Sequence, residues 1–131
     1  GPQTYLGLMV AGFPNMYLIT GPQSPGVKSQ MILSIEYHVE MIAKMIDKIR
    51  CEGLTTVRAE PAAQDAWVEH NNAVANKTLY PAAASWYMGA NIPGKARVFM
   101  PYVGGVKQYR SMCGEVMAEN WRGFAFSADG K

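Results

Sequence analysis

One stretch of the chain combines features that suit the binding of an anion or of a polarised carbonyl group. TGPQSPGVKSQM, residues 20–31, runs from an expected strand end through a glycine–proline turn into the start of a helix. Backbone N–H groups at a helix start, together with the positive end of the helix dipole, favour a negatively charged oxygen. The stretch matches neither GxGxxG nor the Walker A pattern, so an ordinary strand-to-helix turn is the favoured alternative. Lys28 fits either a phosphate contact or a solvated lysine, and the solvated lysine is favoured.

A second stretch combines aromatic side chains with residues that break regular structure. SWYMGANIPGK, residues 85–95, places Trp86 and Tyr87 shortly before two glycines and a proline. These breakers disfavour a helix or a strand, so the aromatic side chains belong to a connection. Such a loop is suited to closing over a flat ligand, with the indole N–H of Trp86 donating a hydrogen bond. A loop whose aromatic rings fold into the local core is an equal alternative.

The remaining polar side chains do not form a recognisable catalytic or metal site. His38 lies between Glu36 and Glu40 on an expected helix, which favours an exposed histidine or one paired with a neighbour. His70 has no second His, Cys or carboxylate at ligand spacing, so no metal site is expected. No serine stands in a GxSxG motif, and the carboxylates are scattered along helix faces. We therefore expect no catalytic residue within this segment.

Composition places the chain among ordinary globular proteins. Its 131 residues suit one domain, with 49% hydrophobic and 17% charged residues and a formal net charge of +2. Basic and acidic residues are mixed along the chain, which argues against a nucleic-acid partner. No apolar run approaches the roughly 20 residues of a membrane span, and no signal peptide is expected at the start GPQTYLGLMV. Cys51 and Cys113 have no useful metal spacing, and we expect buried free thiols in the cytoplasm rather than a disulfide.

The clearest element is a long amphipathic helix over residues 29–51. Ser29 is the expected N-cap, and Gly53 is the expected C-terminal stop. One face carries charges, with Glu40 and Lys44 in the favourable i,i+4 order. The apolar stripe that must pack on a sheet or on another helix consists of Met31, Ile32, Ile35, Val39, Ile42, Met45, Ile46 and Ile49. We expect the isolated chain to expose much of this stripe and to aggregate.

The other expected elements indicate an α/β fold. Residues 16–20, MYLIT, have the pattern of a buried strand. Pro61 is suited to open a helix that runs to about Lys77, with Trp67 and Val74 on its inward side. Further strands are expected over 54–59, 97–103 and 121–127, and a helix over 106–119 with an apolar face formed by Val106, Tyr109, Cys113 and Val116. A strand that leads into a long helix usually pairs with parallel strands, and few other strands are predicted here. We therefore expect this chain to be the end of a larger α/β structure.

Several separate segments resemble one enzyme family, in order and over essentially the whole chain. The C-terminal part of the flavin-dependent Baeyer–Villiger monooxygenases, which include cyclohexanone, phenylacetone and steroid monooxygenases, resembles GFPNMYLITGP, SIEYHVEMIAKMI, GLTTVRAEPAAQDAWVEH and SWYMGANIPGKARVFMPYVGGVKQYR. The resemblance implies the C-terminal part of an α/β flavoprotein with two Rossmann-like dinucleotide-binding domains, which binds FAD and NADPH. Such an enzyme inserts one oxygen atom next to a ketone carbonyl and gives an ester or a lactone. Residues 1–53 would complete the FAD-binding domain, and residues 54–131 would form a C-terminal α/β extension with a mobile loop over 81–95.

The resemblance also implies roles for five residues. Val27, Lys28 and Ser29 would face the substrate pocket. Met31 would lie against the flavin. Trp86 would lie on the mobile loop that orders over bound NADP, with its indole reaching the nicotinamide ribose or the substrate. No catalytic residue is implied within the segment.

The chain departs from the family pattern in the turn and in what it lacks. Gln23 replaces a glycine and Gly26 replaces a serine. Lys28 stands where an apolar residue is usual, and Gln30 replaces an asparagine. The GxGxxG segments and the FxGxxxHxxxWP fingerprint have no counterpart, nor do the arginine and aspartate that the family uses near the flavin. The chain alone is therefore expected to be inactive, as part of a longer or divided enzyme whose remainder carries the dinucleotide-binding motifs.

Two alternatives to this function stay open at the level of sequence. One is a non-catalytic fragment or binding module that keeps the fold of the segment. The other is a related flavin monooxygenase that oxygenates nitrogen or sulfur, which WYMGANIPGK at residues 86–95 makes the weaker of the flavoenzyme hypotheses.

Overall fold

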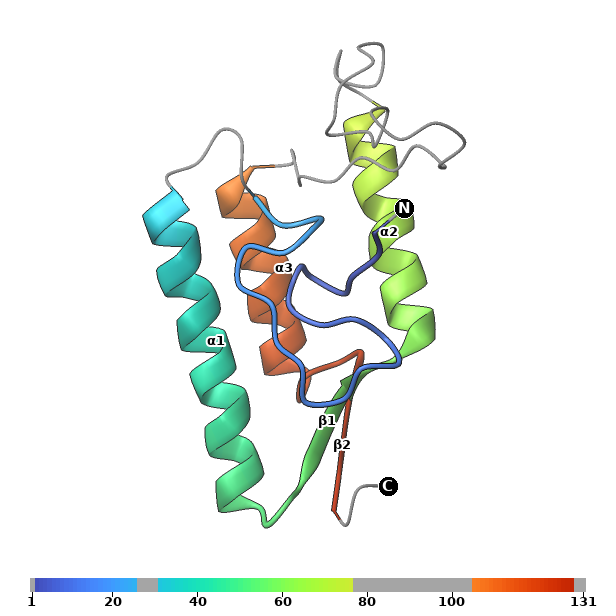
Figure 1. Ribbon diagram of the computed structural model, residues 1–131. Helices are drawn as coiled ribbons and strands as arrows, with labels where there is room; N and C mark the ends of the chain where they lie inside the picture. Colours follow the sequence, from blue (N-terminus) through green and yellow to red (C-terminus); the bar gives the residue numbers. More distant parts are fainter. Residues whose placement is uncertain (1, 26–30, 77–104, 129–131) are drawn as a thin grey trace.

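In the described part of the chain, three helices and two short strands pack around an N-terminal segment that forms neither helix nor strand. The computed structural model describes residues 2–25, 31–76 and 105–128, without the side chain of Met31. The elements follow the chain as α1 (Met31–Cys51), β1 (Thr56–Ala59), α2 (Pro61–Ala75), α3 (Val106–Ala118) and β2 (Phe124–Ser127). In Figure 1, α3 lies between α1 and α2, and both strands lie at one end of the helices. The N-terminal segment, drawn in blue, crosses this arrangement from α2 towards α1.

The long helix forms as predicted and ends at the predicted glycine. Gly53 follows α1 with φ 67°, a left-handed conformation that favours glycine. The N–H of Leu54 then donates to Ile49 O at 2.9 Å, which satisfies one of the carbonyls in the last turn. Ser29, the predicted N-cap, lies outside the described residues.

The two shorter helices also confirm the sequence pattern. Pro61 is the first residue of α2, where a residue without an N–H costs nothing. Trp67 is buried, and Val74 packs partly buried against the core. The inward face of α3 consists of the buried Tyr109, Cys113 and Val116, with Val106 half-buried. The predicted strand over 97–103 and the predicted loop over 81–95 lie outside the described residues.

The two described strands form an antiparallel pair. The register joins Thr56 to Ser127, Val57 to Phe126, Arg58 to Ala125 and Ala59 to Phe124. The strands predicted in these two places are therefore confirmed. The parallel pairing expected from the sequence does not occur between the described strands, because β2 returns along β1 in the opposite direction.

Residues 16–20 do not form the buried strand that the sequence predicts. Met16 and Ile19 are 39% and 48% exposed, and the segment has no regular structure. A strand needs a neighbour that satisfies its backbone groups. The edge of β1 that faces away from β2 is occupied by Asn15, whose N–H donates to Val57 O and whose Oδ1 accepts the Val57 N–H, each at 2.9 Å. The prediction is wrong because that edge is closed to residues 16–20.

The N-terminal segment supplies the centre of the hydrophobic core. Leu6, Leu8 and Met9 are at most 1% exposed, and they share one cluster with residues of all three described helices and of β1. Tyr5 N–H donates to Met9 O at 2.8 Å, and Leu8 N–H donates to Tyr5 O at 3.0 Å. The hydroxyl of Tyr109 donates to Leu6 O at 2.5 Å. Local turns and one side chain thus satisfy backbone groups that are buried outside regular structure.

The helix α1 buries a different face from the one that its apolar pattern predicts. Its most buried side chains are Ser34, His38, Met41 and Met45. At about 100° per residue, Ile35, Val39 and Ile46 lie roughly a third of a turn from these four, and they are 37%, 47% and 43% exposed. Ile42 and Ile49 lie between the two faces and are partly buried. The stripe is therefore correct as a pattern, but much of it does not face the described core.

The two cysteines differ in burial. Both thiols are free, but Cys51 is exposed and Cys113 is buried. The prediction of a buried thiol is wrong for Cys51, because its position in the last turn of α1 falls on the charged face beside Asp47. Burial raises the pKa of Cys113 to about 12, so this thiol stays protonated in the folded chain.

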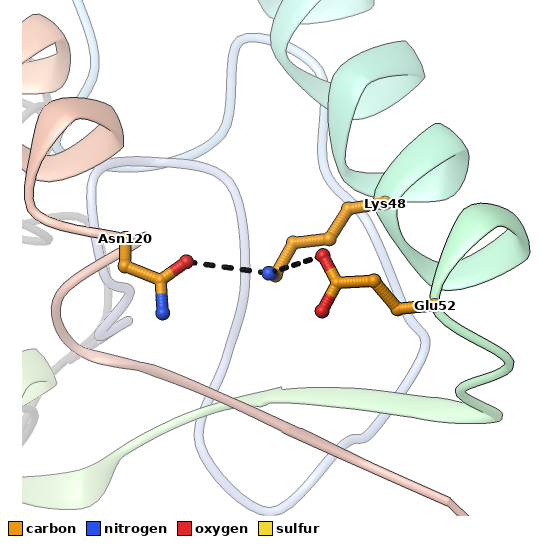
Figure 2. A network of polar contacts seen from close by, with 3 residues as sticks. All are labelled: Lys48, Glu52 and Asn120. Atoms are coloured by element: carbon orange, nitrogen blue, oxygen red, sulfur yellow. Dashed lines mark hydrogen bonds and ion pairs between the residues drawn. The ribbon is translucent and has the colours of Figure 1, made fainter.

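A polar network ties the end of α1 to the connection between α3 and β2. Lys48 Nζ donates to Glu52 Oε2 at 2.7 Å and to Asn120 Oδ1 at 3.3 Å (Figure 2). The same ammonium group lies 5.2 Å from the centre of the Phe126 ring. This end of α1 lies beside the strands in Figure 1, at the opposite end of the helix from the predicted substrate and flavin residues, so we assign the network a structural role.

Candidate functional site

The site residues implied by the sequence lie at or beyond the edges of the described structure. Val27, Lys28, Ser29 and Trp86 fall outside the described residues, and Met31 is the first residue of α1, its side chain not described. The start of α1 adjoins residues 27–29 in the sequence, and the end of α2 and the start of α3 flank the stretch that contains Trp86. All three helix ends lie at the same end of the molecule, away from the strands (Figure 1). The described part of the site is therefore the framework that holds this end.

The turn over residues 20–25 is the described segment that leads directly into the predicted substrate residues. Gln23, at this turn, has a fully buried side chain. Its Oε1 accepts the N–H and the hydroxyl of Thr4, each at 3.1 Å, and its Nε2 donates to Pro2 O at 3.0 Å. Gln23 has φ 63°, a conformation that favours glycine. The glycine that is usual here in the resembled family would adopt it without strain, whereas Gln23 offsets the strain through these buried hydrogen bonds.

Glycines allow the N-terminal segment to lie directly against this turn. A Cβ atom on Gly7 would meet the Cβ of Ser24 at 2.5 Å, and Gly7 has φ 71°. A Cβ atom on Gly21 would meet Gly7 O at 2.6 Å. The hydroxyl of Ser24 donates to Gly21 O at 2.6 Å, which closes the turn on itself. Any side chain at Gly7 or Gly21 would therefore push the turn away from the core.

His38 connects the turn to the core, contrary to the expectation of an exposed histidine or one paired with a helix neighbour. Its side chain is 0% exposed. The N–H of Thr20 donates to its Nδ1 at 2.9 Å, and its Nε2 lies 2.8 Å from the hydroxyl of Tyr109. The Tyr109 hydroxyl donates its hydrogen to Leu6 O, so Nε2 of His38 must be the donor to Tyr109. Because Nδ1 accepts a hydrogen bond and carries no hydrogen, His38 is neutral. The sequence signal for this burial is the spacing of His38 with Ser34, Met41 and Met45, which share one helix face.

Protonation of His38 is expected to destabilise the fold as the pH falls. Burial lowers the pKa of His38 from 6.5 to about 4. Between these values the unfolded chain binds a proton that the folded chain does not. The free energy of unfolding should therefore decrease as the pH falls below about 6.5 and level off below about 4, by on the order of 3 kcal/mol in total. Urea denaturation across this range should show a shallower pH dependence for His38→Leu than for the parent protein, and equal slopes would contradict the assignment.

Trp67 of α2 holds the turn from the other side. Its Nε1–H donates to Gln23 O at 3.2 Å, and the side chain is 4% exposed. The indole meets the ring of Tyr109 at 6.0 Å and 61°, an edge-on contact, and lies 5.5 Å from the ring of His70. Trp67 and His38 both contact Tyr109. The two side chains that bond to the turn are therefore both packed against the first turn of α3.

A separate pocket of about 380 Å³ lies between α2 and α3. Its walls are Tyr5, Leu6, Glu60, Ala63, Ala66, Trp67, His70, Met112, Glu115, Val116, Arg122 and Gly123. None of these residues is among the predicted substrate or cofactor residues, and neither their types nor their spacing in the sequence signals a pocket. No group of three or more His, Cys, Asp or Glu side chains in the described part of the chain could hold a metal ion.

Comparison with known proteins decides the family. No protein-family model matches the chain. A Baeyer–Villiger monooxygenase of Pseudooceanicola batsensis is 41% identical over 92% of the chain, and the acetone monooxygenase of a Gordonia species is 36% identical over 95% of it. The chain is homologous to part of the Baeyer–Villiger monooxygenases. The phenazine N-monooxygenase of Lysobacter antibioticus is also similar, at 35% identity over 98% of the chain.

Solved Baeyer–Villiger monooxygenase structures have the same fold. The cyclohexanone monooxygenase of Rhodococcus sp. Phi1 bound to NADP+ superposes with a TM-score of 0.89 over 97% of the chain, at 33% identity. An oxidized steroid monooxygenase bound to NADP gives 0.88 over 97% of the chain, at 40% identity. The OTEMO complex with FAD and NADP gives 0.79 over 97%, at 29% identity. These matches confirm the predicted family and fold class.

The chain spans less than a quarter of each of these proteins. It covers 22% of the Pseudooceanicola relative, 24% of the Gordonia relative and 23% of the Lysobacter relative. The three solved chains are covered to 24%, 23% and 23%.

Proposed function

We propose that this chain is the C-terminal portion of an FAD- and NADPH-dependent monooxygenase that converts a ketone into an ester or a lactone. The observation that carries the proposal is the combination of 41% identity to a Baeyer–Villiger monooxygenase with a TM-score of 0.89 to a cyclohexanone monooxygenase. The partners are a ketone, O2 and the remainder of the enzyme, which supplies the dinucleotide-binding motifs. The chain supplies the framework of one wall of the site, and the chain alone is inactive.

The residues that we propose for the site are those implied by the family resemblance. Val27, Lys28 and Ser29 would line the substrate pocket, Met31 would contact the flavin, and Trp86 would reach NADP. When bound, the flavin supplies the redox chemistry with O2. The described residues support this arrangement through the fixed turn over 20–25, which leads the chain towards Val27. The division into an FAD-domain portion, residues 1–53, and an extension, residues 54–131, stays a prediction.

The proposal is tested with the complete enzyme that contains this chain. Purified protein should carry FAD, consume NADPH faster when a ketone is added, and give one ester or lactone per ketone consumed. A panel of cyclic, linear and aromatic ketones, with an amine and a sulfide, would identify the preferred substrate class. A protein that binds neither FAD nor NADP would instead support a non-catalytic binding module.

A second candidate function is the oxygenation of nitrogen. The observation that favours it is the similarity to a phenazine N-monooxygenase over 98% of the chain. N-oxide formation from the amine, with no ester formed from any ketone of the panel, would favour this alternative.

Lys28 is expected to set the preference for polar over apolar ketones. A charged ammonium group beside a substrate pocket is costly to desolvate when an apolar ketone binds. We predict that Lys28→Leu in the complete enzyme raises kcat/KM for an apolar ketone relative to a polar one by about tenfold. Lys28→Arg serves as the control that keeps the charge. If Lys28→Leu leaves the ratio of kcat/KM for the apolar and polar ketones unchanged, Lys28 does not line the substrate pocket.

The apolar face of α1 defined by Ile32, Ile35, Val39 and Ile46 is the proposed contact with the remainder of the enzyme. These side chains are 70%, 37%, 47% and 43% exposed, and α1 already buries another face in the core of this chain. A helix that is apolar on more than one side is typical of one buried between two layers. The remainder of the polypeptide is the expected cover, because the relatives are more than four times as long as the chain.

We predict that Val39→Lys lowers the yield of soluble, FAD-containing complete enzyme several-fold, because a charge in this contact would lack a partner. Glu40→Lys is the matched control, since Glu40 adjoins Val39 but lies on the charged face. Soluble yield and the ratio of flavin to protein absorbance report the result. Equal yields of the two variants would show that this face stays in water in the assembled enzyme.

The cytoplasm is the compartment that we propose. Both cysteines are free, as is usual where thiols are kept reduced. No helix within the described residues is long and apolar enough to cross a membrane.

A further inference from the structure

The turn over residues 20–25 is fixed to the core by two side chains that bond to its backbone. Nδ1 of His38 accepts the N–H of Thr20 at 2.9 Å, and Nε1–H of Trp67 donates to the carbonyl of Gln23 at 3.2 Å. Thr20 has φ 52°, an uncommon conformation for a β-branched residue. The bond from Thr20 to His38 thus holds the turn at a residue with an uncommon backbone conformation.

His38 is in turn held by a chain of hydrogen bonds that leaves it one orientation. Its Nε2–H donates to the hydroxyl of Tyr109 at 2.8 Å, and that hydroxyl donates to Leu6 O at 2.5 Å. The histidine ring also packs edge-on against the Tyr109 ring, with centres 5.8 Å apart. Both ring nitrogens have a partner, so the ring cannot rotate without leaving the Thr20 N–H and its own Nε2–H unpaired.

A purely packing role would not require these residue types. The neighbours of His38 on the buried face of α1 include Met41 and Met45, which fill space without polar atoms. A buried imidazole costs free energy unless it is hydrogen-bonded, and an apolar side chain of similar size would pack without that cost. The feature that an apolar side chain would not reproduce is the bond to the backbone of Thr20.

We propose that His38 is a positioning residue that fixes the turn preceding the proposed substrate residues, with Tyr109 holding its ring. His38 acts through Thr20 and the turn over residues 20–25. Val27, Lys28 and Ser29 follow this turn in the sequence. This inference rests on the proposed function, because it assigns the turn to a substrate pocket. Small misplacement of a substrate-binding group lowers catalysis strongly, since orientation contributes a large share of the rate.

Two variants of one residue separate positioning from stability in the complete enzyme. His38→Asn keeps an acceptor at the place of Nδ1 for the Thr20 N–H and loses the contact with Tyr109. His38→Gln keeps a donor at the place of Nε2 for Tyr109 and loses the contact with Thr20. Each variant removes one of the two hydrogen bonds, so a merely structural role predicts similar losses of melting temperature and unchanged catalysis by the folded enzyme.

We expect His38→Gln to lower kcat/KM for the ketone about tenfold and to form less ester per NADPH consumed, per mole of bound FAD. His38→Asn should stay within about twofold of the parent enzyme in both quantities. Tyr109→Phe keeps the Thr20 N–H bond to Nδ1 and removes only the contact at Nε2, so it should resemble His38→Asn. Tyr37→Phe is the control, because the Tyr37 hydroxyl donates to Arg110 O of α3 at 3.4 Å and not to the turn.

Equal kcat/KM and equal ester per NADPH in His38→Gln and His38→Asn would overturn the positioning role. If His38→Asn fails to fold, Tyr109→Phe takes its place in the comparison. If His38→Gln fails to fold, His38→Leu takes its place, because leucine also offers no acceptor to the Thr20 N–H. Equal catalysis in the replacement pair would likewise overturn the role. A parent enzyme that forms no ester from any ketone is a failure of the proposed function, and it is recognised before any variant is made.

Discussion

Replacing Trp67 with alanine is expected to lower the free energy of unfolding by about 3–5 kcal/mol. Trp67 is 4% exposed and shares the core cluster with Tyr109, so its removal leaves a large cavity between α2 and α3. The variant also leaves the carbonyl of Gln23 without the indole N–H that lies 3.2 Å away. Chemical denaturation of the complete enzyme, followed by fluorescence, measures the loss.

Two further variants divide this effect into packing and hydrogen bonding. Trp67→Phe keeps most of the ring but removes the N–H, and it should cost about 1–2 kcal/mol. Trp121→Ala is the matched control, because Trp121 is also buried but packs on Phe124 and Phe126, away from the turn. Both alanine variants should lose stability, but only Trp67→Ala should also raise KM for the ketone. A similar KM in both would show that Trp67 does not act on the turn.

Gly7→Ala is expected to destabilise the protein by about 4 kcal/mol, from strain and overlap together. Gly7 has φ 71°, and the new Cβ would lie 2.5 Å from the Cβ of Ser24. The turn over 20–25 would have to move away from Leu6 and Leu8, which are buried beside it. The loss is measured by the same denaturation experiment.

The control for Gly7→Ala is Gly12→Ala. Gly12 also has a positive φ, 90°, but a Cβ there would meet nothing within 4 Å. Gly12→Ala should lower the free energy of unfolding by about 1–2 kcal/mol, from backbone strain alone. Adding Ser24→Gly to Gly7→Ala removes the atoms that overlap, and it should recover part of the loss. If the double variant recovers nothing, the overlap with Ser24 is not the cause.

Much of the regular structure follows from local sequence. Gly53 ends α1, Pro61 opens α2, and the apolar spacing of α3 places Tyr109 in the core, because each of these features depends on residues only a few positions apart. The pairing of β1 with β2 was not predictable in the same way. Its direction depends on how the chain returns after α3, which local patterns do not determine.

The N-terminal segment and His38 show where local patterns are insufficient. Leu6 and Leu8 are buried without a helix or strand, because partners such as Tyr109 and Leu18 are supplied from distant positions. His38 has glutamates two residues away on either side, but positions two apart face different sides of a helix. The stripe containing Val39 was recognised correctly, and much of it is exposed in the chain alone, as expected. Periodicity does not show what covers such a face.

The candidate site was accessible from the sequence only through family resemblance. From composition and spacing alone, residues 20–31 could be an ordinary strand-to-helix turn, and residues 85–95 could be a loop packed on the core. The similarity of several segments to the Baeyer–Villiger monooxygenases is what indicated a binding site. Comparison confirms that family. The contacts behind the turn, from His38 and Trp67, required the three-dimensional arrangement because they join residues 18 and 44 positions apart.

The most direct test of the central claim is to follow oxygen from O2 into product with the complete enzyme that contains this chain. The enzyme is supplied with FAD, NADPH, a ketone and isotopically labelled O2, and the product is analysed by mass spectrometry. We predict an ester or lactone that carries one labelled oxygen atom per molecule, formed only when NADPH is present. A product without label, or NADPH consumption with no oxygenated ketone product across the whole panel, would contradict the assignment of this chain to a Baeyer–Villiger monooxygenase activity.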